Sequence, residues 1–211
     1  MSLEVLNTTA SLLTVAIVAA TALAALVQLR HLRAGNQTQA LLSVSERLDA
    51  REFRDALTVA NQGLEAALAD STFREYITAI TRRVQPPEAS RRSVEMHNAV
   101  VKVANTLEVL GVLVKNRVVE PGLFVDAYCS VAFGAWQRLA SYTAFVRDLE
   151  GDDAIWEHFE YLAALSEDWI ARHPSSYPAG VRRLKLRNPW PSPTSPSRRP
   201  SASPSLDARD D

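Results

Sequence analysis

The residue with the clearest chemical potential is a carboxylate inside an apolar helical segment. Glu108 has apolar neighbours on both sides along the chain. An unpaired buried charge is costly, so this side chain needs a partner or has to stay protonated. We expect the partner to be Asn105, one helical turn away, or Arg138 on the next helix, and we expect Gly111 to let another helix approach closely. These four residues predict a buried polar network or the binding site of a partner.

Histidines near acidic residues raise the question of a metal site. Two groups qualify: His97 with Glu95 and Glu108, and His158 with Glu157 and Glu160. Di-iron bundles use Glu-x-x-His, which places both ligands on one helix face. Neither group has that spacing, and HExxH, paired CxxC, GxGxxG, GxxxxGK[ST] and GxSxG do not occur. We assign no catalytic, metal or cofactor residue and expect no cofactor. A metal-binding or catalytic bundle using Glu108 with His97 or His158 remains the alternative.

An apolar segment near the N-terminus predicts a membrane helix. No charged residue lies between Val5 and Leu29. A helix rises about 1.5 Å per residue, so residues 9–29 span roughly 30 Å, the thickness of the hydrocarbon core of a bilayer. We expect a single transmembrane helix over 9–29, preceded by a short extracytoplasmic N-terminus, 1–8.

The charges beside this segment favour an anchor over a cleaved signal peptide or a buried helix of a soluble protein. A secretory signal has positive charge before its apolar run, whereas here Glu4 precedes the run and Arg30, His31 and Arg33 follow it. The positive-inside rule then places the rest of the chain in the cytoplasm. The single cysteine, Cys129, fits a reducing compartment. We expect a single-pass protein of the plasma membrane.

The elements that position Glu108 are predicted to be helices. Only seven glycines occur in 211 residues, and abundant Ala, Leu, Arg and Glu favour helix. We expect an all-α protein with about five helices in a cytoplasmic bundle, residues 30–173. A first break is expected at Gly35 and Asn36, and another near Asp49 or Gly63.

Further helix ends follow from capping signals. Thr72 and Glu75 have the spacing of a capping box, which would begin a helix at Phe73, and Ser71 is an alternative cap. That helix should end before Pro86, because the residue ahead of a proline avoids the helical region. Residues 88–119 form the clearest helix, and its nearly all-round apolar surface predicts a place at the centre of the bundle.

Two more helices are predicted after this central one. Pro121 suits the first turn of the next helix, since its missing N–H would be unpaired there. Gly151 should end that helix, and Asp152 or Asp153 should cap the last one.

The C-terminal stretch, residues 174–211, has the composition of a disordered tail. It holds eight of the 11 prolines, and its seven basic residues outnumber three acidic ones. The candidates for contact with acidic lipid are Arg182, Arg183, Lys185, Arg187 and Trp190. Nucleic-acid binding is not expected, because residues 30–173 carry 16 basic and 20 acidic residues with no basic stripe.

The central helix resembles the signature of a known family. Asn105, Glu108, Gly111 and Val114 occur as N-x-x-E-x-L-G-x-L-V. This motif is similar to that of a family of uncharacterised bacterial proteins, a domain of unknown function. The resemblance would cover roughly residues 5–172 and implies an N-terminal membrane helix followed by a cytoplasmic helical domain. Its members usually have glycine where this chain has Asn116 or Arg117. No catalytic role comes with the resemblance.

These features together predict a membrane-anchored interaction or regulatory protein rather than an enzyme. The expected partners are the lipid bilayer and another protein or further copies of the same chain, because an Ala-rich membrane helix can self-associate through small residues.

Overall fold

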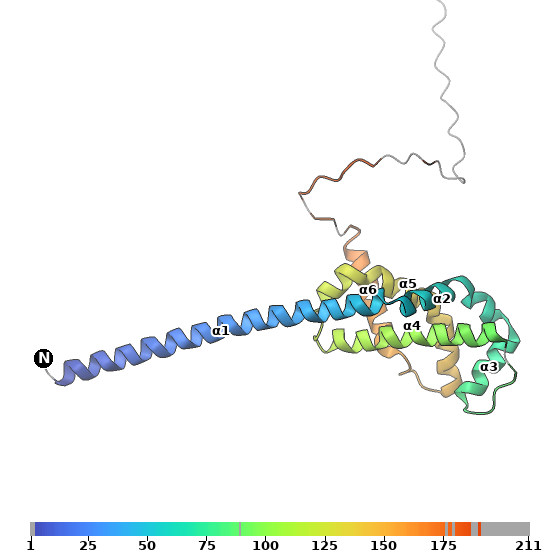
Figure 1. The fold of residues 1–211 in the computed structure, drawn as a ribbon, viewed down its shortest axis with the longest axis horizontal. Coiled ribbons are helices and arrows are strands. Elements are labelled where there is room, and N and C mark those ends of the chain that lie inside the picture. Colours follow the sequence, from blue (N-terminus) through green and yellow to red (C-terminus); the bar gives the residue numbers. More distant parts are fainter. Residues whose placement is uncertain (1–2, 89, 176, 179, 187–189, 191–211) are drawn as a thin grey trace, which may run out of the picture. The chain divides into compact units, whose positions relative to one another are not determined.

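The structure is a computed structural model that describes residues 3–88, 90–175, 177–178, 180–186 and 190. Within these residues every regular element is a helix, which confirms the all-α prediction. The six helices are α1 (Leu3–Asp49), α2 (Arg51–Ala69), α3 (Ser71–Thr81), α4 (Arg91–Lys115), α5 (Pro121–Glu150) and α6 (Glu157–Arg172) (Figure 1). The chain divides into two units, Met1–Ser176 and Tyr177–Asp211.

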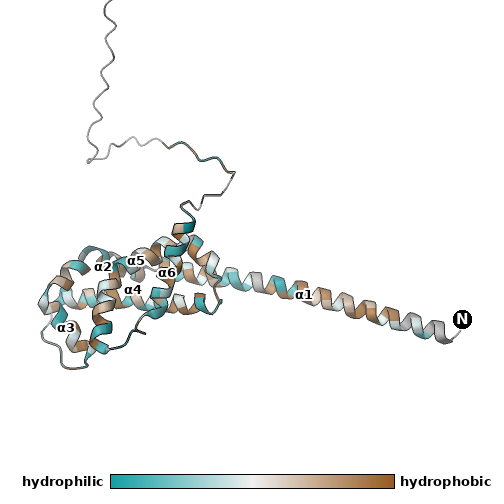
Figure 2. Cartoon of the chain, turned by 180° about the vertical axis from the view of Figure 1, so that it is seen from behind, coloured by the Kyte–Doolittle hydropathy of each residue, from teal (hydrophilic) through white to brown (hydrophobic). Residues whose placement is uncertain are grey.

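Helix α1 carries the apolar segment and is the one described helix long and apolar enough to span a membrane. Figure 2 shows mainly hydrophobic colours along its first half. Every residue from 11 to 32 is exposed, so this segment is not a core helix of its own chain.

The break predicted at Gly35 and Asn36 is wrong, because α1 continues through both residues to Asp49. A glycine inside a helix costs only about 1 kcal/mol. Continuing the helix brings Val44 and Leu48 into the core of the bundle, where they are 1% and 6% exposed. Burying two such side chains is worth roughly 3–6 kcal/mol, which exceeds the cost of the glycine.

The helix changes direction at Ala50, whose extended backbone (ψ 135°) separates α1 from α2. This confirms the predicted break near Asp49. The alternative at Gly63 is wrong, because α2 runs through that residue.

Helix α4 lies at the centre of the bundle, as its all-round apolar surface predicts. It packs mainly against α2 and α6 and also against α5. Its fully buried side chains include Val100, Val103, Leu107, Leu110 and Val114, each 0% exposed. The helix is shorter than expected, because Ser90 caps its N-terminus and Asn116 its C-terminus.

The start of α3 differs from the predicted capping box. Asp70 is the N-cap, and its Oδ1 accepts hydrogen bonds from the backbone N–H and the hydroxyl of Thr72, both 2.9 Å long. The backbone bond, and then the hydroxyl bond, lower the pKa of the Asp70 carboxyl. An ionised carboxylate is the better acceptor, so Thr72 donates to the cap and the helix begins at Ser71.

The expected ends of α5 are confirmed. Pro121 occupies its first turn, and the Glu120 carboxylate accepts a hydrogen bond from the backbone N–H of Leu123 (2.8 Å). Gly151 ends the helix in the left-handed conformation, with φ 67°.

The turn after α4 contains a left-handed residue other than glycine. Arg117 has φ 55°, at one of the two positions where the resembling family usually has glycine. The N–H of Val118 bonds to the carbonyl of Leu113 (2.9 Å), a bond that closes a helix C-terminus around a left-handed residue. The turn therefore keeps the geometry that favours glycine, although the chain has arginine there.

We predict that Arg117→Gly raises the free energy of unfolding by about 1 kcal/mol, because glycine removes the steric cost of the left-handed backbone. Urea denaturation of the full-length protein in mild detergent, followed by tryptophan fluorescence, measures the change. Asn116→Gly is the control: its φ is −84° and its side-chain amide donates to Val112 O (2.8 Å), so this variant should lose stability. Equal effects of the two variants would contradict the prediction.

Candidate functional site

The N-terminus of α6 has no cap from its own local sequence. The N-cap residue is Trp156, which makes no side-chain capping bond and has φ 55°. The predicted cap from Asp152 or Asp153 is wrong. Asp152 instead accepts a hydrogen bond from the N–H of Ala154 (2.8 Å) and closes a turn before the helix.

Glu108 of α4 supplies the missing cap. Its Oε2 accepts a hydrogen bond from the backbone N–H of Phe159 (2.8 Å), and its Oε1 accepts one from Nδ1 of His158 (2.7 Å). Phe159 is the third residue of α6, whose N–H an N-cap side chain normally binds. A carboxylate is also favoured at this position by the helix dipole. A side chain about 50 residues away in the sequence thus acts as the cap of α6.

The expected partners of Glu108 are therefore wrong. Arg138 is exposed and donates to the carbonyl of Gly134 (2.7 Å). It lines a groove between α2 and α5. Asn105 does not bind Glu108 either, since its Oδ1 accepts a hydrogen bond from the indole Nε1 of Trp156 (2.8 Å). Asn105 and Glu108 hold the same segment of chain at two neighbouring points.

Gly111 completes this contact by allowing close approach. A Cβ atom on Gly111 would overlap the backbone carbonyl of His158 and lie 2.8 Å from the Cβ of that residue. Because backbone atoms cannot move aside as a flexible side chain can, only glycine fits here. We call Asn105, Glu108 and Gly111 the α6 seat. These three of the four predicted network residues meet the segment 156–159, and Arg138 does not.

His158 links the seat to a cation. The ammonium of Lys115 lies 3.0 Å from its Nε2. An ammonium group can only donate, so Nε2 is the acceptor in this contact and Nδ1 donates to the Glu108 carboxylate. Both carboxylate oxygens and both ring nitrogens are therefore already engaged in holding α6.

The structure does not bring the alternative metal ligands together as a set. Glu108 and His97 lie 11 residues apart on α4, a rise of about 16 Å. Glu108 does meet His158, but a lysine occupies the other ring nitrogen. Among the described residues, no group of three or more His, Cys, Asp or Glu side chains could hold a metal ion.

Helix α5 holds the residues on either end of this segment through a side chain that the sequence did not single out. Arg147 donates from Nε to the carbonyl of Ile155 (2.9 Å) and pairs through Nη1 with Glu160 (2.7 Å). Its side chain is 16% exposed and lies over the ring of Trp136. The local sequence around Arg147 contains no signal for this role, because its partners lie beyond the next turn.

His97 belongs to an aromatic cluster next to the seat. Its Nδ1 is 2.8 Å from the hydroxyl of Tyr142, and its ring makes an edge contact with Tyr76. Tyr142 also packs against Trp156, with ring centroids 6.0 Å apart. Burial lowers the pKa of His97, and it raises the pKa of Tyr142 with a smaller contribution from Tyr76. Both groups are therefore neutral at pH 7.

We predict that the free energy of unfolding falls in mild acid because of the protonation of His97. The lowered pKa means that the unfolded chain takes up a proton near its ordinary value of 6.5 before the folded chain does. Stability from the neutral imidazole is full above this value and is lost as the pH falls from it to the lowered folded pKa. Urea denaturation between pH 8 and about 5 should show a shallower pH dependence for His97→Gln than for the wild type. The same slope in both proteins would contradict the assignment.

The candidates for lipid contact lie in the second unit. Arg182, Arg183 and Lys185 are exposed, and Trp190 is 79% exposed. The guanidinium of Arg183 lies 4.8 Å from the ring centroid of Tyr177. Arg187 and the predicted tail segment 191–211 lie outside the described residues.

Comparison with known proteins agrees with the prediction of a family of unknown function. No curated protein and no solved structure matches the chain. A family model does match, over residues 15–169. This range contains the whole α6 seat and the segment that it binds. The chain therefore belongs to the family described as Domain of unknown function (DUF4760).

Proposed function

We propose that this protein is a single-pass membrane protein whose cytoplasmic helical bundle is an interaction or regulatory module. The observation that carries the proposal is the exposed apolar run of α1, residues 11–29, on a helix whose last turns enter the bundle core. An apolar helix of this length needs a hydrocarbon environment, because exposing that much apolar surface to water is unfavourable.

The family match supports an anchor over a cleaved signal. It begins at residue 15, inside the apolar run, so the second half of the run belongs to the shared domain. The same helix then supplies Val44 and Leu48 to the core. Arg30 and Arg33 follow the run and favour a cytoplasmic bundle under the positive-inside rule.

The first test is extraction of membranes with sodium carbonate. We expect the full-length protein to stay in the pellet. The double variant Val18→Arg/Leu23→Arg should move to the supernatant, since each arginine at the centre of a span costs about 2.5–3.5 kcal/mol. The control is Leu184→Arg/Leu186→Arg, two exposed positions outside α1, which should stay in the pellet. A wild type found in the supernatant would overturn the proposal.

The second test is orientation in the plasma membrane. A fluorescent-protein fusion after residue 211 should be fluorescent, because this reporter matures in the cytoplasm. An alkaline phosphatase fusion there should be inactive, because that enzyme matures only outside the cytoplasm. The opposite pattern would place the bundle outside.

The bundle is proposed to bind a protein rather than a small-molecule substrate. The polar residues of the α6 seat already make hydrogen bonds that hold the fold together. Asn105 and Glu108 of the seat each have partners within the chain, and so does His158, which meets Glu108. Cross-linking in intact membranes followed by purification should recover a stoichiometric protein partner or a self-complex. We expect no nucleic acid to be purified with it. Recovery of a bare monomer would count against the module.

The basic stretch 182–190 is proposed to add contact with anionic lipid. Each cation near such a surface is worth about 1 kcal/mol, and Leu184, Leu186 and Trp190 are highly exposed beside the cations. Deleting residues 181–211 should reduce binding of the protein to phosphatidylserine vesicles in a salt-sensitive way. Unchanged binding would remove this part of the proposal.

A further inference from the structure

Three polar residues within the apolar run of α1 recur at a spacing of seven. They are Thr14, Thr21 and Gln28, and Ser11 lies three residues before the first of them, whereas Thr9 at the start of the span lies outside this repeat. The same seven-residue step continues beyond the apolar run to Gly35 and Leu42. A strict spacing of seven is the repeat of a left-handed pair of helices and not that of a lone straight helix.

The intervening positions complete the heptad seam. They are Ser11, Val18, Ala25, Leu32 and Gln39, each three residues before a member of the first series. We call residues 11, 14, 18, 21, 25, 28, 32, 35, 39 and 42 the α1 seam. Within the membrane its residues other than Val18 are small or polar, while the bulkiest side chains of the span, such as Leu12, Ile17, Leu23 and Leu26, lie off it.

A small and polar line suits a helix contact in lipid. Small residues let two backbones approach, and polar side chains in hydrocarbon are favoured where they meet another helix. Thr21 already donates to the carbonyl of Ile17 (2.8 Å), which leaves its oxygen able to accept a further bond. The side-chain amide of Gln28 makes no hydrogen bond to another described residue, although it can both donate and accept.

The bundle leaves most of this line open on the cytoplasmic part of α1, although Gln39 lines a cavity with Arg117 and Val118 of the turn after α4. The residues of α1 that pack into the bundle are Ala40, Val44 and Leu48. On a helix of 3.6 residues per turn, positions 35 and 42 lie roughly opposite position 44. Leu32 and Leu42 are accordingly 64% and 60% exposed. The apolar side chains of Leu32 and Leu42, before and after Gly35, are thus not covered by any other part of the described chain.

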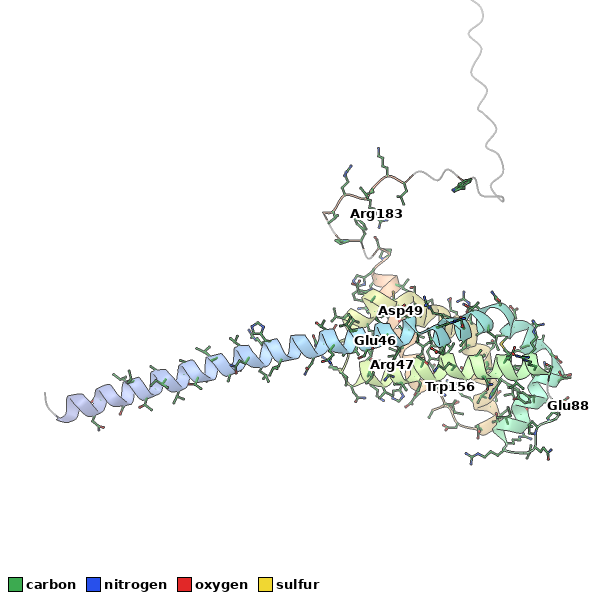
Figure 3. All side chains as sticks on the ribbon, in the orientation of Figure 1. Glu46, Arg47, Asp49, Glu88, Trp156 and Arg183 are labelled. Atoms are coloured by element: carbon green, nitrogen blue, oxygen red, sulfur yellow. The ribbon has the colours of Figure 1, made fainter. Side chains whose placement is uncertain are left out.

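The charges around the line allow two identical copies to meet. The residues flanking it between 31 and 45 are His31, Asn36, Thr38, Ser43 and Ser45, none of which is acidic, lysine or arginine. The next positions of the repeat are Glu46 and Asp49, both exposed at the end of α1 (Figure 3). Two copies would repel there, so the contact should end at Leu42.

From this pattern we infer that α1 binds a second copy of the same chain along the α1 seam, in a parallel left-handed pair over residues 11–42. The inference rests on the proposed membrane anchoring. Two copies inserted in the same orientation place each seam residue next to its equivalent, as a two-fold interface requires. The Gln28 amides then meet and satisfy each other, and the two bundles lie on the outer sides of the pair.

The test is disulfide cross-linking in isolated membranes, with Cys129→Ser removing the native cysteine. Single cysteines are placed in the seam as Thr21→Cys and Gln28→Cys, and off it as Leu23→Cys and Leu26→Cys. After oxidation with copper phenanthroline, the two seam variants should form a covalent dimer and the other two should not. Cross-linking at all four positions alike, or at none, would overturn the inference.

A second measurement tests the energetic role of the seam. Sedimentation of the full-length protein in mild detergent should show a dimer, and Gln28→Leu should weaken it about threefold to tenfold. Leu26→Ala, off the seam, should leave the dimer unchanged. If carbonate extraction retains the protein in membranes but it is monomeric, the dimer is wrong and the anchor stands. If carbonate releases the protein, both fail.

Discussion

Replacing Gly111 with alanine is expected to separate the N-terminus of α6 from α4 and to lower the free energy of unfolding by about 3 kcal/mol or more. The added Cβ would overlap the backbone carbonyl of His158, and the backbone cannot turn aside. Moving α6 away would also break the hydrogen bonds from Phe159 and His158 to Glu108. Urea denaturation in mild detergent measures the loss.

A second helical glycine provides the matched control. Gly134 lies inside α5, and a Cβ there would approach only Nη1 of Arg138, at 3.3 Å. That atom is the end of a flexible side chain and can move. Gly134→Ala should therefore be neutral or stabilise the protein by about 0.5–1 kcal/mol, as expected for alanine inside a helix. Losses of similar size in both variants would show that the close approach at Gly111 is not the cause.

Replacing Glu108 with alanine is expected to lower the free energy of unfolding by about 3 kcal/mol, because two hydrogen bonds to a charged acceptor are lost and the N–H of Phe159 is left unpaired. Glu108→Gln should lose about half as much, since one oxygen can still accept a bond. The same denaturation experiment measures both. A drop in helix content should accompany the loss, because α6 has no other cap at its N-terminus.

The control for Glu108 is a carboxylate on the outer face of the same helix. Glu95 pairs with Arg91 (2.8 Å), but both side chains are more than half exposed. Glu95→Ala should change stability by no more than about 0.5 kcal/mol. Combining Glu108→Ala with His158→Ala should lose less than the sum of the two single variants, because they share a bond. A purely additive double variant would contradict the pairing.

The α6 seat gives the motif of the central helix a physical meaning. Asn105, Glu108 and Gly111 follow one another at helical spacing and meet residues 156–159. Asn105 accepts a hydrogen bond from the indole of Trp156, and Glu108 caps α6. Gly111 has no side chain and so lets the backbone of His158 approach closely. All three act on the same short segment. The motif therefore describes how the last helix docks onto the central one.

The elements whose signals are local could be predicted from the amino-acid sequence. The uncharged run before Leu29, the proline at the start of α5 and the glycine at its end each act through their own backbone or their nearest neighbours. The all-round apolar surface of α4 predicted its central position for the same reason, because burial follows from the helical pattern of one segment. These features could be read without knowing where any distant residue lies.

The tertiary structure alone decided the partners of the polar residues. Whether Glu108 meets Arg138 or His158 depends on the rotation of α5 and α6 about their axes, which local sequence does not specify. The continuation of α1 through Gly35 was likewise decided by burial of Val44 and Leu48 further along. The cap of α6 comes from a residue about 50 positions earlier. Interactions over such separations depend on how the helices pack, and that packing is a property of the whole bundle.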